Sequence, residues 1–185
     1  MKTKKIFLPL LLIVFAIAIN IPAFYVFSQQ QSSEIKVGSK VPEFALRDQN
    51  GKEFDLKNVI GLKNLVIYFY PKDDTPGCTK EACSFRDQYE KFIEADAMVI
   101  GISSQSIDSH KKFADKYKLP FTLLSDSANI VRKLFGVQTN ENGNIPGRVT
   151  FVIDKTGIII FTFNSLTQPL KHVEEALQIL KNNTN

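Results

Sequence analysis

Short apolar runs alternate with amphipathic stretches along the chain, and the most informative run is Leu65–Tyr70. Its six residues are apolar or aromatic and partly β-branched, long enough for a buried strand and too short for a helix. Pro71 ends this strand, because proline cannot donate a hydrogen bond to a sheet. The apolar positions that follow recur at helical spacing. They predict an amphipathic helix with a buried stripe of Ala82, Phe85, Tyr89, Phe92 and Ile93.

A second buried strand is predicted at residues 97–103, and the remaining pattern adds two hairpins and three helices. The Asn-Gly pair at residues 50–51 is a strong hairpin signal between strands at 41–46 and 53–56. The further elements are a helix at 106–118, a short strand at 122–124, a helix at 128–135 preceded by the capping residue Asp126, a hairpin of strands at 149–153 and 158–163, and a helix at 169–180. This order predicts a mixed α/β fold, with a central sheet of parallel and antiparallel pairs sandwiched by helices.

The N-terminal segment follows a different pattern. Three lysines in the first five residues precede Ile6–Phe27, which is mostly apolar. This stretch is long enough to span a bilayer and longer than the apolar region of an ordinary secretory signal. We therefore expect a separate membrane segment over residues 1–28, a polar linker over 29–36 and one globular domain over 37–185.

The lysines also predict an orientation. Positive residues stay on the cytoplasmic side of a membrane, which places the globular domain outside the cytoplasm, periplasmic or lumenal, and anchored by the N-terminal helix. The alternative is a signal peptide cleaved near Ala16–Ala18, which gives a secreted domain.

The charge balance does not indicate a nucleic-acid partner. The chain has 23 basic and 19 acidic residues, so removing the three leader lysines leaves 20 against 19. The globular part is near neutral, and the sequence pI of about 9.0 reflects the leader.

Cys78 is a candidate nucleophile. Thr75 and Pro76 form a favourable N-cap and N1 pair, so the helix after the first strand begins just before Cys78. A helix N-terminus carries partial positive charge and free N–H groups, which stabilise a thiolate, the nucleophilic form of cysteine. The alternative is an inert buried cysteine or one half of a structural disulfide.

Cys83 is the only other cysteine, five residues further along the same predicted helix. An intact helix separates two such Cα atoms by roughly 8–9 Å, beyond the ~7 Å limit for a disulfide. Cys78 and Cys83 can pair only if the first turn unwinds, which suits a redox cycle better than a static cross-link. The alternative for Cys83 is a small core residue.

The stretch Tyr70–Asp87, YPKDDTPGCTKEACSFRD, resembles the active-site stretch of peroxiredoxins of the Q, or bacterioferritin-comigratory, type. These are thiol peroxidases on a thioredoxin-like fold with an added N-terminal hairpin. The resemblance extends over roughly residues 34–180, and Gly147–Asp154, GRVTFVID, is similar to a second family motif. It implies a thioredoxin-like fold and an antioxidant enzyme that reduces hydrogen peroxide and organic hydroperoxides.

The resemblance also implies roles for five residues. Cys78 is implied to be the peroxidatic cysteine and Cys83 the resolving cysteine. Thr75 is implied to hydrogen-bond the thiolate and the peroxide, and Pro71 to shield the cysteine from water. Arg148 belongs to the second motif, where a fixed guanidinium stabilises the charge that develops on the departing oxygen. Taken alone, an arginine before a strand is usually a surface charge.

The implied reaction needs no bound cofactor. A hydroperoxide oxidises Cys78 to a sulfenic acid, Cys83 condenses with it to an intramolecular disulfide, and thioredoxin or a similar dithiol protein reduces that disulfide. The resemblance to the Q type implies a monomer.

Other residues and functions stay open at this point. His110 and His172 lie on different predicted helices far from Cys78, and a C-x4-C pair lacks zinc-site spacing, so no metal is expected. Glu81 and Arg86 are interpreted as helix-surface or supporting residues. Two alternative functions are a membrane-tethered thiol–disulfide oxidoreductase on the same fold and a membrane-tethered redox sensor that passes its disulfide to a partner.

Overall fold

The computed structural model describes residues 35–139, 143 and 146–183, which belong to one structural unit, Ser33–Asn185. The membrane segment expected over residues 1–28 and most of the expected linker, 29–36, lie outside the described residues. Within the described residues, no helix is both long enough and apolar enough to cross a membrane.

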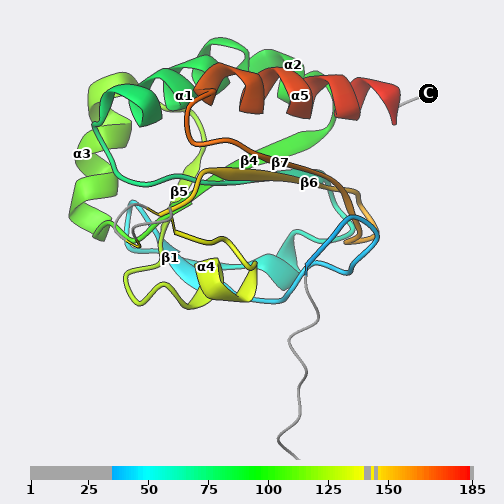
Figure 1. The fold of residues 1–185 in the computed structure, drawn as a ribbon, viewed down its shortest axis with the longest axis horizontal. Helices are drawn as coiled ribbons and strands as arrows, with labels where there is room; N and C mark the ends of the chain where they lie inside the picture. Colours follow the sequence, from blue (N-terminus) through cyan, green and yellow to red (C-terminus); the bar gives the residue numbers. More distant parts are fainter. Residues whose placement is uncertain (1–34, 140–142, 144–145, 184–185) are drawn as a thin grey trace, which may run out of the picture. The chain divides into compact units, whose positions relative to one another are not determined.

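A seven-stranded mixed sheet forms the centre of the domain, in the order β2-β1-β5-β4-β3-β6-β7 (Figure 1). The pairs β3/β4 and β4/β5 are parallel, and the other neighbours are antiparallel. The sheet contains both kinds of pair, as the sequence pattern predicts, and β1 and β2 form the expected N-terminal hairpin. The strands are β1 (Ala45–Asp48), β2 (Glu53–Asp55), β3 (Asn64–Phe69), β4 (Ala97–Ser103), β5 (Thr122–Ser125), β6 (Val149–Ile153) and β7 (Ile159–Asn164).

β3 is buried along nearly its whole length because both of its faces are covered. All residues from Leu65 to Phe69 are buried, and β3 pairs with β4 on one side and β6 on the other. A nearly continuous apolar run is what such a strand requires. β3 ends one residue before Tyr70, whose N–H still donates to Ile102 O at 3.1 Å. The chain then leaves the sheet at Pro71.

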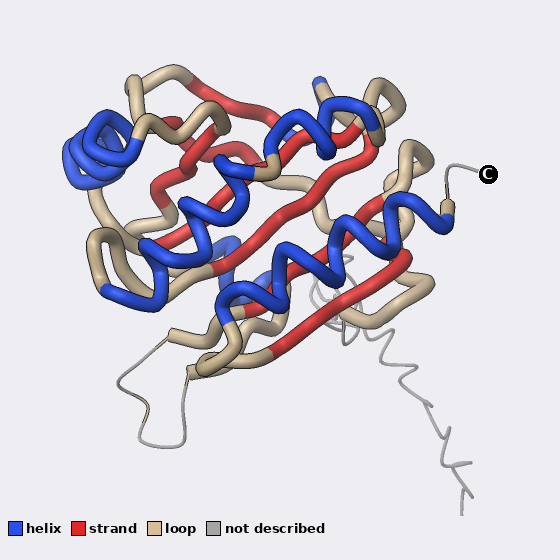
Figure 2. Tube along the Cα trace, turned by 90° about the horizontal axis from the view of Figure 1, so that it is seen from above, coloured by secondary structure: helices blue, strands red, loops and turns tan. Residues whose placement is uncertain are grey.

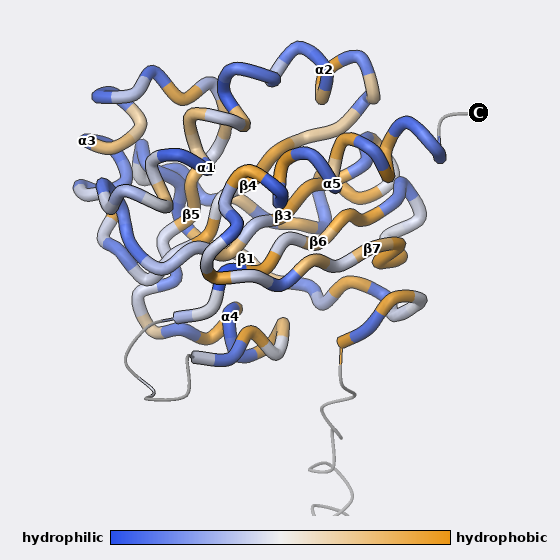
Figure 3. Tube along the Cα trace, turned by 45° about the horizontal axis from the view of Figure 1, so that its top comes forward, coloured by the Kyte–Doolittle hydropathy of each residue, from blue (hydrophilic) through white to orange (hydrophobic). Residues whose placement is uncertain are grey.

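Helices cover both faces of the sheet. One face carries a core to which Phe85, Phe92 and Phe113 contribute, and the opposite face carries a second core that includes Phe44 and Phe135. Figure 1 shows α1, α2 and α5 along one side of the sheet and α4 on the other, and Figure 2, the view from above, shows helices lying across the strands. The central strands β3, β4 and β6 are mostly hydrophobic (Figure 3). The helices are α1 (Pro76–Asp87), α2 (Tyr89–Glu94), α3 (Ile107–Tyr117), α4 (Ile130–Leu134) and α5 (Pro169–Asn182), with a 3-10 turn, η2, at Leu56–Asn58.

One predicted helix is divided in the structure. The sequence pattern continues it to Ile93, but Gln88 leaves helical geometry, with φ −111° and ψ 12°, and separates α1 from α2. The change of direction lets Phe92 pack on Phe85 with ring centroids 5.5 Å apart. Ile93 is 47% exposed as a result. Including Ile93 in the buried stripe was therefore wrong.

Polar side chains define the starts of α3 and α4. Ser106 Oγ accepts a hydrogen bond from Ser109 N at 3.2 Å, as expected of an N-cap. Asp126 accepts hydrogen bonds from Ile130 N and Arg132 N, each at 2.8 Å. Asp126 therefore holds the start of α4 as predicted, although α4 begins two residues later than the pattern suggests.

Candidate active site

Cys78 lies in the first turn of α1. This helix begins at Pro76, and Thr79 N donates to Thr75 O at 2.8 Å, so Thr75 occupies the N-cap position. The Thr75 hydroxyl does not cap the helix. It donates instead to Lys72 O at 3.1 Å and holds the turn that precedes the helix.

Arg148 faces Cys78 from the start of β6. Because β6 pairs with β3, the residue before β6 lies beside the loop and helix that follow β3. Arg148 Nη2 lies 3.4 Å from Cys78 Sγ, and the two residues are 3% and 2% exposed. Arg148 is therefore not a surface charge. Gly77 leaves room for it, since a Cβ there would lie 3.2 Å from Nη2.

Glu81 holds the guanidinium of Arg148 from the opposite side. Glu81 Oε2 forms an ion pair with Arg148 Nη1, and Arg148 Nε donates to Leu166 O at 3.3 Å. Glu81 is fully buried, so it is a supporting residue of the site and not a helix-surface residue. Burial raises the pKa of Glu81 to about 8, against the attraction of Arg148, which lowers it. Glu81 holds the guanidinium through Nη1, which leaves Nη2 directed towards Cys78.

His172 of α5 lies behind this ion pair. Its Nδ1 is 2.9 Å from Thr150 Oγ1, its Nε2 is 2.8 Å from Ser165 O, and Glu81 Oε1 is 3.8 Å away. Burial lowers the pKa of His172 to about 4; the Ser165 carbonyl opposes this shift and Arg148 adds to it. Sequence analysis did not connect His172 with the site, because its partners come from other strands and loops.

A cavity of about 570 Å³ opens beside Cys78. Four of the five residues that sequence analysis assigned to the site, Pro71, Thr75, Cys78 and Arg148, line it together. The remaining lining residues are Lys72, Ser104, Gln105, Pro146 and Leu166. Residues from both sequence motifs therefore line one cavity.

Ser104, Gln105 and Leu166 were missed by sequence analysis. Ser104 and Gln105 directly follow β4, and Leu166 follows β7. The strands β3, β4 and β7 run in the same direction, so their carboxyl ends meet at one edge of the sheet. Ligand sites of α/β proteins concentrate at that edge, which is a signal that the strand order alone could have provided.

Cys83 does not reach the cavity. It lies on α1 with intermediate exposure, and both cysteines are free. α1 is continuous from Pro76 to Asp87, so the helical separation of roughly 8–9 Å between the two Cα atoms applies. The two cysteines share one helix but not one pocket.

Comparison with known proteins gives consistent matches. Residues 37–162 match the AhpC/TSA family. The chain is 52% identical over 149 residues to a chloroplastic peroxiredoxin Q of Sedum lineare, with 80% of each chain covered. It is 54% identical over 149 residues to the chloroplastic peroxiredoxin Q of Arabidopsis thaliana, covering 80% of this chain and 68% of that one. The crystal structure of peroxidoxin BcpB from Mycobacterium tuberculosis superposes with a TM-score of 0.75 at 36% identity, over 80% of this chain and 97% of that chain.

The localisation expected from the N-terminal pattern is wrong. The relatives from Sedum lineare and Arabidopsis thaliana are named as chloroplastic proteins. These findings contradict both a membrane-anchored domain outside the cytoplasm and a secreted one. Hydropathy measures the length of an apolar segment and does not identify the compartment that receives it.

The family and structural matches cover the domain that carries the cavity. They agree with the mixed sheet and flanking helices, so the fold is thioredoxin-like, as the resemblance implied. The chain belongs to the AhpC/TSA family, in its peroxiredoxin Q branch, and is a thiol-dependent peroxidase.

Proposed function

We propose that Cys78 is the peroxidatic cysteine of this enzyme. The observation that carries the proposal is the 3.4 Å contact between Cys78 Sγ and the Arg148 guanidinium at the wall of an open cavity. A thiolate there attacks one oxygen of a hydroperoxide, an S–O bond forms and the O–O bond breaks. Sulfur is oxidised to the sulfenic acid, and the departing oxygen takes a proton and leaves as water or an alcohol.

Arg148 stabilises this step electrostatically. Its Nη2 faces the sulfur, while Glu81 and the Leu166 carbonyl fix the orientation of the guanidinium. A preorganised cation aimed at developing charge lowers the barrier without having to reorganise during the reaction. Arg148 therefore serves both the attacking thiolate and the departing oxygen.

Thr75 and Pro71 complete the peroxide pocket. The hydrogen of the Thr75 hydroxyl is directed to Lys72 O, which leaves the oxygen lone pairs as acceptors. We expect Thr75 to accept a hydrogen bond from the O–H of the hydroperoxide. Pro71 lines the same cavity without an N–H group and limits the water that reaches Cys78.

Cys83 is the proposed resolving cysteine. It condenses with the sulfenic acid of Cys78, releases water and forms an intramolecular disulfide, which thioredoxin or a similar dithiol protein reduces by thiol–disulfide exchange. Because both cysteines lie on α1 of one chain, resolution needs no second subunit, and this supports a monomer. The catalytic domain in this proposal is residues 37–185.

A coupled assay tests the cycle. The purified protein is mixed with hydrogen peroxide, thioredoxin, thioredoxin reductase and NADPH, and NADPH oxidation is followed. We expect many turnovers per enzyme and none in a Cys78→Ser variant. A single stoichiometric oxidation without turnover would contradict the proposed regeneration and favour a redox sensor.

A further inference from the structure

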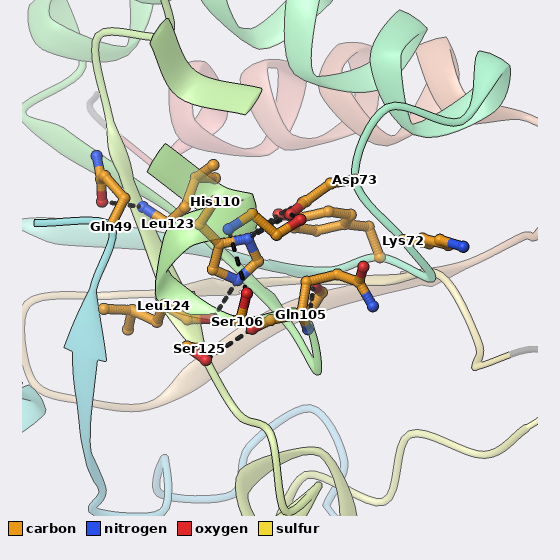
Figure 4. A network of polar contacts seen from close by, with 12 residues as sticks. Gln49, Lys72, Asp73, Gln105, Ser106, His110, Leu123, Leu124 and Ser125 are labelled. Carbon is orange, nitrogen blue, oxygen red and sulfur yellow. Dashed lines mark hydrogen bonds and ion pairs between the residues drawn. The ribbon is translucent and has the colours of Figure 1, made fainter. Parts of the chain in front are cut away.

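A buried carboxylate lies in the middle of the active-site loop. Asp73 is 6% exposed, although it stands between β3 and α1 in the loop that lines the cavity. Tyr70 Oη donates to its Oδ1 at 2.7 Å, and Ser109 Oγ donates to its Oδ2 at 2.6 Å. His110 Nδ1 lies 2.9 Å from Oδ2 and 3.1 Å from Oδ1 (Figure 4). The proposed peroxidase cycle uses none of these contacts.

The second nitrogen of His110 also faces an acceptor. His110 is fully buried, and its Nε2 lies 3.1 Å from Leu124 O, a backbone carbonyl that can only accept (Figure 4). Although burial raises the pKa of Asp73, hydrogen bonds and charge from His110, with Ser109 and Tyr70, lower it overall, so this carboxyl is ionised. The Tyr70 hydroxyl, 3.3 Å from Nδ1, already directs its hydrogen to Asp73. Imidazolium is the only form of the ring that donates to both acceptors.

Asp73 and His110 therefore form a buried ion pair, which is a costly arrangement. Removing both charges from water offsets much of their attraction, so a well-packed apolar pair often stabilises a fold equally well. The pair joins the active-site loop to α3 and, through Leu124 O, to β5. The ion pair is therefore better explained by a role in positioning the loop than by a contribution to stability.

The loop is tied to α3 at a second point. Asp74 has φ 57°, a left-handed conformation that is unfavourable for a residue other than glycine. Its carboxylate accepts hydrogen bonds from Lys116 Nζ at 2.6 and 2.8 Å and from Tyr117 Oη at 2.6 Å. Two consecutive aspartates thus anchor the loop to one helix, and their neighbours Lys72 and Thr75 line the same cavity as Cys78.

We propose that Asp73 and His110 are positioning residues for the peroxidase reaction. Their ion pair holds the loop so that Pro71, Lys72 and Thr75 stay at the wall of the peroxide cavity, with the Thr75 oxygen in reach of the substrate. Neither side chain touches the reacting atoms. This inference rests on the proposed function for its kinetic consequence, but the charge state of the pair is independent of it.

The charge state is tested by ¹⁵N NMR of the reduced, full-length protein at neutral pH. The chain has two histidines, so a His110→Asn variant identifies the signals by their loss. We expect both ring nitrogens of His110 to carry a proton. A ring with one unprotonated nitrogen would overturn the ion pair, whatever the enzyme's activity.

The positioning role is tested by the second-order rate of Cys78 oxidation by hydrogen peroxide, measured with Asp73→Asn, His110→Asn and the double variant. We expect each single change to slow oxidation by about tenfold or more, since small displacements in a reactive geometry have effects of this order or larger. The double variant should be no slower than the slower single variant, because it leaves no unpaired buried charge. The matched control is Asp115→Asn, an exposed carboxylate on the same helix, which should react like the wild type.

The remaining outcomes are also decisive. Variants that fold with lower stability but keep the wild-type oxidation rate would show that the pair only stabilises the fold, and would overturn the proposal. If the buried variants do not fold, Ser109→Ala removes one donor to Asp73 from a half-buried position and should slow oxidation by about fivefold. An unchanged rate in Ser109→Ala would also overturn it. A wild-type protein inert to peroxide would instead refute the proposed function and leave the NMR result standing.

Discussion

The two histidines of the chain are both fully buried, yet their surroundings lead to different charge states, one positive and one neutral. His110 on α3 faces two acceptors, the Asp73 carboxylate and Leu124 O, and the ring must carry two protons to satisfy both. His172 on α5 donates to Ser165 O through Nε2, and its Nδ1 faces the Thr150 hydroxyl, which can donate or accept. Burial lowers the pKa of this ring to about 4, so it is neutral. Equal burial thus leads to different charge states, because His110 meets a carboxylate at hydrogen-bond distance, whereas His172 meets only a hydroxyl and a carbonyl at that distance.

The charge states of the two histidines match the charged groups that lie next to them. His172 lies on the side of the Arg148 guanidinium, whose positive charge helps to lower its pKa. His110 lies on the side of the Asp73 carboxylate, which attracts a positive ring. A second cation beside Arg148 would be repelled, whereas a cation beside Asp73 completes a pair. His172 is therefore neutral beside Arg148, and His110 is positive beside Asp73.

The comparison of the two histidines bears on function only if peroxide is reduced at Cys78. We expect Cys78→Ser to abolish peroxide reduction, because it removes the nucleophile. Cys83→Ser should keep the first oxidation and lose thioredoxin-linked turnover, because resolution is absent. Peroxide consumption and NADPH oxidation distinguish the two steps, and sustained turnover by the Cys78→Ser protein would refute the assignment.

Removing Arg148 tests the cationic side. Arg148→Ala should slow Cys78 oxidation by about 10²-fold or more, as loss of a preorganised electrostatic donor does elsewhere. Stopped-flow measurement with hydrogen peroxide provides the rate. Arg86→Ala is the matched control, since Arg86 lies on α1, where it pairs with Asp87 and donates to Tyr117 O, and it does not line the cavity. Equal rates for Arg148→Ala and wild type would show that the guanidinium has no part in the reaction.

The neutral state of His172 makes the stability of the protein depend on pH. Its pKa is lowered from 6.5 to about 4, so the unfolded chain binds more protons between these values. The stabilisation, roughly 3 kcal/mol in full, is present above pH 6.5 and is lost as the pH falls towards 4. About 2 kcal/mol should be lost between pH 7 and pH 5. Urea unfolding at a series of pH values measures this change.

A His172→Gln variant isolates this contribution. Glu81, whose pKa is raised to about 8, changes stability with the opposite sign, since its protonated form is favoured in the folded state as the pH falls. Subtracting the pH profile of the variant from that of the wild type removes this background. A difference profile that is flat from pH 7 to pH 4 would mean that His172 is not held neutral by its surroundings.

The sequence predicted the elements and four of the nine residues that line the cavity, but not the polar groups behind them. Apolar periodicity located β3 and α1, and two motifs far apart in the chain supplied Cys78 and Arg148. Glu81 lies three residues after Cys78 and four before Phe85, so its place on the buried stripe was visible in the spacing, although its charge suggested the surface.

The histidine environments could not be predicted in this way. The acceptors that fix their charges are backbone carbonyls, Leu124 O and Ser165 O, brought into place by the packing of distant elements. A carbonyl is present at every residue, so nothing in the sequence distinguishes these two. Only the fold determines which carbonyl meets which ring.

The smallest expected effect is a local one within α1. Disulfide formation requires the turn between Cys78 and Cys83 to unwind, because the intact helix holds the two Cα atoms too far apart. The structure sets limits on this unwinding. On one side the Asp73–His110 pair anchors the loop, and on the other Phe85 is fully buried and stacks on Tyr68 with ring centroids 4.6 Å apart.

We therefore expect the oxidised protein to show faster amide exchange from Gly77 to Ser84 than the reduced protein, with the amide of Tyr70 and the strands protected in both. Local opening costs much less than global unfolding when few buried contacts are lost, and here the losses are confined to Glu81, Ala82 and their neighbours. Hydrogen exchange on the two forms side by side measures the difference, with Cys83→Ser under the same oxidant as the control that cannot form the disulfide. Equal protection of the two forms across Gly77–Ser84 would show that the cysteines meet without melting the turn. Exchange that spreads to Tyr70 would show that the Asp73–His110 pair does not anchor the loop when the helix opens.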